Sequence, residues 1–288
     1  MNRYEMYSKR LMWSGAFLLT AVMAGCGGGG DGGGGGGGTP APQAGPAYYD
    51  MGAAASFGAG SGNGVHNQGT KTAVTGNLGT TAASTTITGF HDANKSYSET
   101  PANIGAVSGT IFTDTDPAGD NGKTGAAVAT ALSNAYTALS PLTLTTGTEP
   151  NAATPGELGG VTLASGVYRS ANLQITGGDL TLDAKGDPNA FWVFQSDNSL
   201  TVGDAQARNV VLANGALSKN VFWRVGNSAT INAAGGGTMV GTIITSSGLN
   251  ISSLAGEANP TTLNGRAFVF GGTAVDMFNT IINTPATP

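Results

Sequence analysis

The sequence has few charged residues, two histidines and a single cysteine. Among its 288 residues, 12 are Lys or Arg and 17 are Asp or Glu, and beyond the extreme N-terminus the basic residues form no cluster. Nucleic-acid binding is excluded, because it needs a basic surface. A structural zinc site needs about four soft ligands, and a nucleophilic triad needs a His beside its Ser or Cys. We therefore expect no metal, no cofactor and no enzymatic activity.

Glycine and threonine are abundant by contrast, with 48 and 36 residues respectively. The charged side chains are too few to cover an ordinary helical surface. Hydroxyl groups and backbone must therefore supply much of the polar surface. Threonine side chains suit a pleated sheet better than a helix. The composition therefore predicts an all-β protein.

The N-terminal segment is predicted to direct and tether the chain rather than to fold. Basic residues precede the apolar run 11–24, which is too short to cross a bilayer as a helix. Small residues stand directly before Cys26, and the glycine-rich tract 27–38 follows. This arrangement resembles a bacterial lipoprotein signal, in which the Cys is acylated after cleavage on its amino side. The departure is Met23, where that pattern usually has Leu, and an ordinary secretory signal is the alternative.

We accordingly expect three segments: a removed signal peptide at 1–25, the lipidated Cys26 with a flexible Gly/Pro-rich linker at 26–46, and one domain at 47–288. Several acyl chains anchor a protein stably where one does not. The mature protein would then be exported and held by lipid at the cell surface, in the outer membrane of a Gram-negative bacterium. We expect it to be a monomer.

From residue 160 onward the sequence repeats one phrase five times: an apolar strand, a Gly/Ser/Asn corner, a second short alternating strand, another corner and a third strand. A period of roughly 20–30 residues with such short strands is typical of a β-solenoid, in which each turn covers the next. Side chains alternate along a strand, so the second strands should display one outward column when the turns stack. That column is Gln174, Thr201, Thr230, Asn250 and Asp276. Its expected flanks are Asn172, Ser199, Ser228 and Gly248 on one side, and Thr176, Gly203, Asn232 and Ser252 on the other.

Apolar residues recur at helical spacing only over about 124–140, and we expect this helix to cover the apolar strands that carry Phe191 and Phe222. The preceding segment, about 90–123, is expected to cap one end of the solenoid. It contains the Asp-rich loop 114–122, which does not fit a calcium-binding EF-hand and is interpreted as a solvated loop.

Several sequence motifs resemble those of the microbial ice-binding (antifreeze) proteins, a family with a discontinuous β-solenoid and one flanking helix. They are LGGVTLASGVY at 158–168, LTLDAKGDP at 180–188, NVFWRVGNSAT at 220–230 and LNGRA at 263–267. Shorter matches stand at 74–79 and 87–90. The resemblance implies a three-sided solenoid whose N-terminal strands complete a turn beside the C-terminal ones.

The resemblance also implies ice binding through a flat face, which we match to the face of the second strands. The residues expected to contact ice are Gln174, Thr176, Ser199, Thr201, Ser228, Thr230, Asn232, Asn250, Ser252 and His66. In this sequence Gly64, His66 and Gln68 stand where the family has a Thr-rich strand, and Asp276 stands where a neutral residue is usual.

The predicted function is that of a cell-surface protein that adsorbs to ice, limiting ice growth or recrystallisation or attaching the cell to ice. Its partners would be ordered water of the ice surface and, through Cys26, a membrane. The alternative is a surface adhesion or matrix module that binds polysaccharide on the same scaffold.

Overall fold

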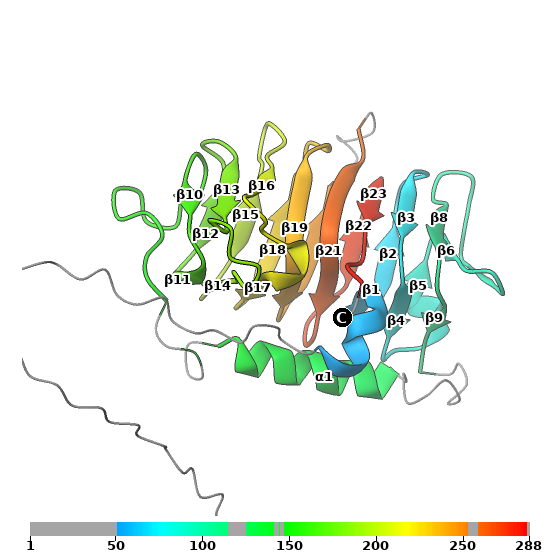
Figure 1. Ribbon diagram of the computed structural model, residues 1–288. Coiled ribbons are helices and arrows are strands. Elements are labelled where there is room, and N and C mark those ends of the chain that lie inside the picture. Colours follow the sequence, from blue (N-terminus) through cyan, green and yellow to red (C-terminus); the bar gives the residue numbers. More distant parts are fainter. Residues whose placement is uncertain (1–50, 115–124, 141–143, 145–146, 253–258, 287–288) are drawn as a thin grey trace, which may run out of the picture. The chain divides into compact units, whose positions relative to one another are not determined.

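The computed structural model describes residues 51–114, 125–140, 144, 147–252 and 259–286. The chain divides into two compact units, Met1–Ala41 and Pro42–Pro288, and every described residue belongs to the second. The predicted signal, Cys26, the linker and most of the Asp-rich loop lie outside the described residues. The described part is a three-sided β-solenoid whose successive turns pair almost entirely in parallel (Figure 1). The predicted fold class is confirmed.

One side of the solenoid, called here the seven-stranded face, is a sheet with the order β12-β15-β18-β20-β22-β2-β5. Its strands are β12 (Leu173–Ile175), β15 (Leu200–Val202), β18 (Ser228–Ile231), β20 (Gly248–Ile251), β22 (Val275–Met277), β2 (Val65–Asn67) and β5 (Ile87–Thr88). The N-terminal strand β2 pairs with the C-terminal strand β22. This is the discontinuous strand order that the family resemblance implies.

The second side is covered by a helix. Its strands are β11 (Gly166–Ser170), β14 (Trp192–Ser196), β17 (Val221–Val225), the second halves of β19 (Thr238–Thr245) and β21 (Thr261–Val269), β1 (Phe57–Ser61), β4 (Asn77–Thr80) and β9 (Ile111–Phe112). Here α1 (Gly125–Ala138) buries Leu132 in one cluster with Phe222 and Phe268. The helix therefore covers the apolar strands as predicted. Within the described residues, no helix is long and apolar enough to cross a membrane.

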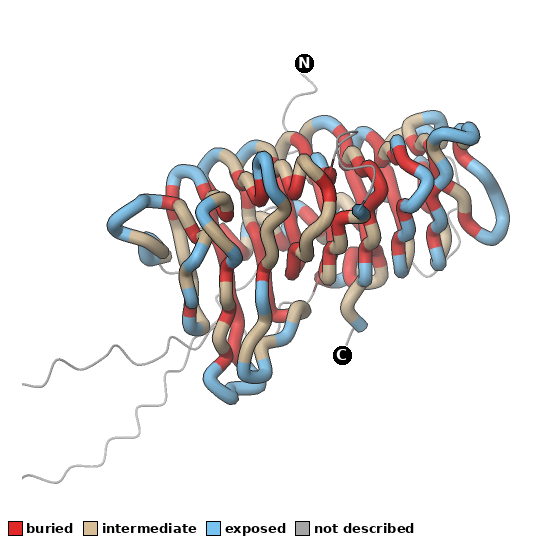
Figure 2. The backbone as a smooth tube through the Cα atoms, turned by 90° about the horizontal axis from the view of Figure 1, so that it is seen from above, coloured by how far each residue is buried: buried red, intermediate tan, exposed pale blue. Residues whose placement is uncertain are grey.

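The third face completes the triangle. It contains β10 (Thr162–Leu163), β13 (Leu180–Asp183), β16 (Val210–Ala213), the first halves of β19 and β21, β23 (Thr280–Ile282), β3 (Thr72–Val74), β8 (Gly105–Val107), β6 (Phe90–His91) and β7 (Ser96–Tyr97). Strand β7 pairs antiparallel with β6. Short 3-10 helices lie at η1 (Gly52–Ser56), η2 (Ser84–Thr86) and η3 (Ser218–Asn220). Buried side chains fill the interior between the three faces. Figure 2 marks the buried residues along the backbone.

Strands β19 and β21 run over two faces because each bends at a glycine. Gly241 has a φ of +101°, which disfavours any side chain, and it pairs in register with Gly265. A Cβ atom at Gly265 would lie 1.8 Å from the Gly241 carbonyl oxygen. The sequence pattern predicts apolar strands at 241–245 and 265–270, which start at these glycines. In the structure, the strands begin earlier, at Thr238 and Thr261, and continue through the corner.

Both ends of the stack are covered by chain. At one end, Thr148 bridges to Tyr168 of β11 and Glu157 bridges to Gln174 of β12. At the other end, the described part of the segment expected to form a cap supplies β6, β7, β8 and β9. These contacts limit the number of unpaired backbone groups at the sheet edges, which would otherwise invite pairing with another chain.

The two ends of the described domain meet at the corner between the third face and the helix-covered face. The chain enters just before β1 and leaves just after β23. Arg266 is 4% exposed, and its guanidinium donates hydrogen bonds to the carbonyl oxygens of Ala55 and Pro285. In a three-sided solenoid, this corner lies opposite the seven-stranded face.

Candidate functional site

The outward side chains of the seven-stranded face form one continuous column, as alternation along the second strands predicts. Register pairs join the residues of this column in the order Gln174, Thr201, Thr230, Asn250, Asp276, His66 and Thr88. Six of them are half-buried and Asn250 is exposed. Neighbouring strands of a sheet lie about 4.7–4.9 Å apart, so the column is a ladder of evenly spaced polar groups.

The inward neighbours hold this column in place. Leu173 and Ile175 of β12 are at most 1% exposed, and so are the equivalent residues of the next four strands, as predicted. A core this closely packed resists local displacement. The polar column is therefore held on a rigid support.

The two expected flanking columns differ. Ser199 and Ser228 are half-buried, and the Ser199 hydroxyl donates a hydrogen bond of 2.9 Å to the Asn172 side-chain oxygen. Together with the central column, they form a two-dimensional arrangement, because same-face residues along a strand lie about 6.6–6.8 Å apart. On the first flank, Asn172, Ser199 and Ser228 therefore face solvent beside the column, whereas Gly248 is buried, contrary to the expectation.

The expectation that Asn232 and Ser252 face solvent is wrong. Both have left-handed backbone, with φ of +46° and +63°, which ends the alternation of the strand. Asn232 is completely buried, and its side-chain amide bonds the backbone N–H and carbonyl of Arg208 at 2.9 and 3.0 Å. Ser252 is 8% exposed. These residues build the corner after the strand, a role that a period-two pattern cannot reveal.

Thr176 is also engaged within the protein. Its hydroxyl and its backbone N–H both donate hydrogen bonds to the carboxylate of Glu157, which lies beside the edge strand β12. Burial would raise the pKa of Glu157, but the hydrogen bonds from Thr176 and from the backbone N–H groups of Gly159 and Gly177 outweigh it, and the pKa is lowered. An ionised carboxylate therefore borders the column at this end, and no motif in the sequence indicated it.

A histidine and a carboxylate interrupt the column near its other end. His66 Nδ1 lies 2.8 Å from Asp276 Oδ1, and their side chains are 35% and 37% exposed. The hydrogen bond to Asp276 raises the pKa of His66 above its usual value of 6.5, although burial opposes the shift. Gly64, which stands nearby where the family has a Thr-rich strand, has a steric reason. A Cβ atom at this position would lie 2.4 Å from the Thr86 carbonyl oxygen.

The raised pKa of His66 predicts a small pH dependence of stability. The stabilisation by Asp276 is fully present below pH 6.5, the ordinary pKa of histidine in an unfolded chain, and is lost as the pH rises through the higher pKa of His66 in the folded state. We expect wild type to be more stable than Asp276→Asn, and we expect this difference in unfolding free energy to be larger at pH 5.5 than at pH 9. The increase should be less than about 1 kcal/mol, because the pair is partly exposed. Urea unfolding at both pH values measures this, and a difference that grows toward pH 9 would contradict it.

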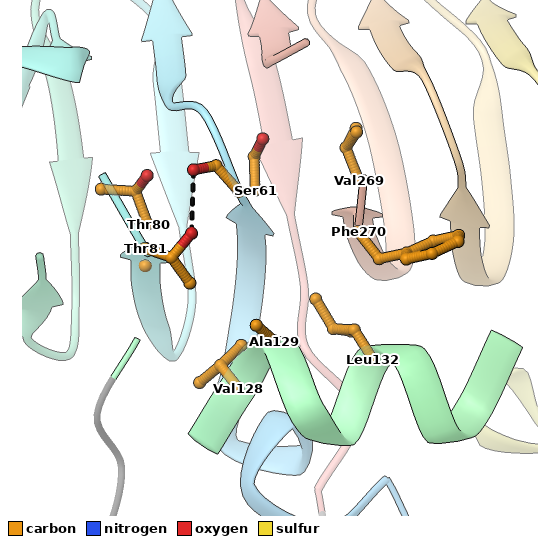
Figure 3. A pocket seen from close by; sticks show the side chains of 10 residues that line it. Ser61, Thr80, Thr81, Val128, Ala129, Leu132, Val269 and Phe270 are labelled. Carbon is orange, nitrogen blue, oxygen red and sulfur yellow. Dashed lines mark hydrogen bonds between the residues drawn. The ribbon is translucent and has the colours of Figure 1, made fainter. Parts of the chain in front are cut away.

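The other candidate sites are weaker candidates for binding or catalysis. Within the described ranges, no three His, Cys, Asp or Glu residues are grouped so as to hold a metal ion. A small hollow between α1 and the strand ends is lined by Leu132, Val269 and Phe270 among others (Figure 3). It has room for about one water molecule, so it is not a ligand site. The second histidine, His91, bonds Glu99 on the cap, with 2.6 Å between Nδ1 and Oε1.

The fold and the polar column define a class of protein: a discontinuous, helix-flanked β-solenoid that presents one open face of mostly uncharged polar groups and, in its described part, no cluster that could hold a metal ion. The chain belongs to the ice-binding-like family, whose profile matches residues 59–283.

Known proteins support this assignment. The chain is 37% identical over 183 residues to an ice-binding protein of Nostoc sp. (strain HG1), which covers 63% of this chain and 56% of that protein. It is 44% identical over 86 residues to ice-binding protein 1 of Shewanella frigidimarina, or 28% of this chain and 10% of that one. The crystal structure of an ice-binding protein from the ascomycete Antarctomyces psychrotrophicus superposes with a TM-score of 0.62 at 29% identity, covering 83% of this chain and 98% of that chain.

The matches cover little more than half of the Nostoc protein and a tenth of the Shewanella protein. The family and these relatives are ice-binding proteins and not enzymes, in agreement with the expectation from composition.

Proposed function

We propose that the protein adsorbs to ice through the seven-stranded face. The observation that carries this proposal is the run of four uncharged polar side chains in register, Gln174, Thr201, Thr230 and Asn250, beside the half-buried hydroxyls of Ser199 and Ser228. Family membership and the names of the relatives support it. Of the other residues predicted to contact ice, His66 lies in the same column, whereas Thr176, Asn232 and Ser252 are engaged in the scaffold.

The mechanism that we infer is preorganisation. Hydroxyl and amide groups hold first-shell waters, and each immobilised water costs up to about 2 kcal/mol. Because the buried residues beneath the face fix the polar groups, this cost is met before ice arrives, and many weak contacts can add along the surface. The methyl groups of Thr201 and Thr230 restrict neighbouring water without bonding it. Adsorption would limit ice growth or recrystallisation.

The test is adsorption of the fluorescently labelled full chain to a single growing ice crystal. We expect protein to concentrate on the crystal and to produce thermal hysteresis, with albumin as the control. Exclusion of the protein from ice to the same extent as albumin would refute the proposal. Binding to a polysaccharide array in that case would select the alternative of an adhesion module.

We further propose that Cys26 carries a lipid anchor and that the monomeric domain is displayed at the cell surface, in the outer membrane of a Gram-negative cell. The sequence before Cys26 supports the anchor. The position at which the chain enters the domain, at the corner opposite the seven-stranded face, suits a tether that leaves that face free.

Metabolic labelling with a palmitate analogue tests the anchor. We expect labelling and membrane fractionation in wild type and the loss of both in Cys26→Ser. Release of wild type into the medium would contradict the anchor, and light scattering of the detergent-solubilised protein would report the oligomeric state.

A further inference from the structure

We propose that the His66–Asp276 pair sets one boundary of the ice-contacting surface and confines it to β12, β15, β18 and β20. This inference rests on the proposed function and concerns which part of the seven-stranded face takes part. Both residues of the pair belong to the central column, between Asn250 of β20 and Thr88 of β5. The polar column thus divides into a run of four neutral residues, the hydrogen-bonded His66–Asp276 pair and one isolated threonine.

The pair is poorly suited to contact ice for a reason of hydrogen-bond chemistry. A water molecule in ice donates two hydrogen bonds and accepts two. An ionised carboxylate only accepts and an imidazolium only donates, whereas a hydroxyl or a carboxamide does both. The Asp276 carboxylate is about one third exposed and only accepts hydrogen bonds from the waters above it. His66 donates its hydrogen bonds to Asp276 and to the backbone of Thr86, so the pair leaves these waters a one-sided pattern that a lattice cannot continue.

Charge also limits the opposite end of the run. Glu157 bridges to the edge strand β12, and its carboxylate is held by the Thr176 hydroxyl and backbone N–H groups. The four neutral residues therefore lie between a carboxylate on one side and the pair on the other. Strand spacing gives this run a length of about 14 Å, against about 29 Å for the seven strands together.

Removing the charges should therefore enlarge the contact surface. In His66→Thr/Asp276→Thr, the column from Gln174 to Thr88 becomes neutral over all seven strands. We expect thermal hysteresis at equal concentration to rise at least two-fold. A second double variant, His66→Gln/Asp276→Asn, removes the charges while keeping side-chain size and hydrogen bonding, and we expect the same direction of change. It decides the question if the first variant does not fold.

The cap offers a matched control. His91→Thr/Glu99→Thr removes the other His–carboxylate pair, whose bonded atoms are 2.6 Å apart, from a position off the seven-stranded face. We expect no change in thermal hysteresis from this variant, with folding of all variants checked by circular dichroism.

Thr88 gives an independent readout of the boundary. In wild type, Thr88→Tyr should lower thermal hysteresis far less than Thr230→Tyr does, because Thr88 lies beyond the pair. In the His66→Thr/Asp276→Thr background, the same substitution should abolish the gain, because the enlarged surface includes Thr88.

The proposed ice binding and the proposed boundary are contradicted by different results. If wild type adsorbs to ice but the folded charge-free variants gain nothing, or if Thr88→Tyr disables wild type as strongly as Thr230→Tyr does, the boundary is overturned and ice binding stands. If wild type is inactive and the charge-free variants are active, the proposed function of the wild-type chain fails, and the pair blocks the whole face instead of bounding an active part of it. If neither wild type nor any charge-free variant adsorbs, both proposals fail.

Discussion

Thr230→Tyr should lower the thermal hysteresis of the protein at least ten-fold while leaving its fold intact. Thr230 lies in the middle of the four-residue run, paired in register with Thr201 on one side and Asn250 on the other. Its side chain is outward and half-buried, so the larger ring can extend into solvent without disturbing Ile231 beneath the face. The ring would hold an ice surface away from the neighbouring strands. Because the contacts are individually weak, the loss of a few removes most of the adsorption.

The control is Thr181→Tyr, which places the same ring on the third face. Thr181 is also outward, half-buried and paired in register on both sides, with Thr162 and Val211. We expect this variant to keep the activity of wild type. Equal losses in the two variants, or full activity in a folded Thr230→Tyr protein, would show that the seven-stranded face is not the ice-binding surface.

Trp223→Ala should destabilise the domain by about 3–5 kcal/mol. The indole is completely buried, stacks on Phe194 with 4.0 Å between ring centroids, and donates a hydrogen bond of 2.8 Å from Nε1 to the Val240 carbonyl oxygen. Truncation would leave a large cavity and remove the partner of a buried carbonyl. Equilibrium unfolding in urea measures the change in free energy.

The matched substitution is Val211→Ala on the third face. Val211 is 43% exposed, so its truncation should change the unfolding free energy by no more than about 0.5 kcal/mol. A loss below about 1 kcal/mol in Trp223→Ala would mean that the interior tolerates rearrangement, contrary to the close packing described here.

The sequence was sufficient to predict the central column because two simple regularities determine it. Each second strand alternates, and the repeat stacks equivalent residues, so Gln174, Thr201, Thr230 and Asn250 align in register. The helix was similarly predictable from its apolar spacing. Both features depend on local periodicity, which a single sequence displays directly.

Other features depend on backbone geometry or on distant contacts, and these were missed. The left-handed conformation at Asn232 turns a residue inward that alternation places outside. The bend at Gly241 continues a strand where a break was expected. Glu157 reaches β12 from outside the repeats. The placement of β1 between β21 and β4 followed only from the family resemblance, because no periodicity indicates a pairing over 200 residues apart.

The meeting of the two ends of the described domain at Arg266 makes the domain suitable for insertion and permutation. One guanidinium bonds both Ala55 and Pro285, so a short peptide could join these two ends of the domain and new ends could be opened in an exposed turn. The intact domain could equally be spliced into a surface loop of a host protein. Several copies carried in this way on one particle would each present the seven-stranded face outward, and simultaneous engagement would raise the avidity of the assembly for ice without any new contact.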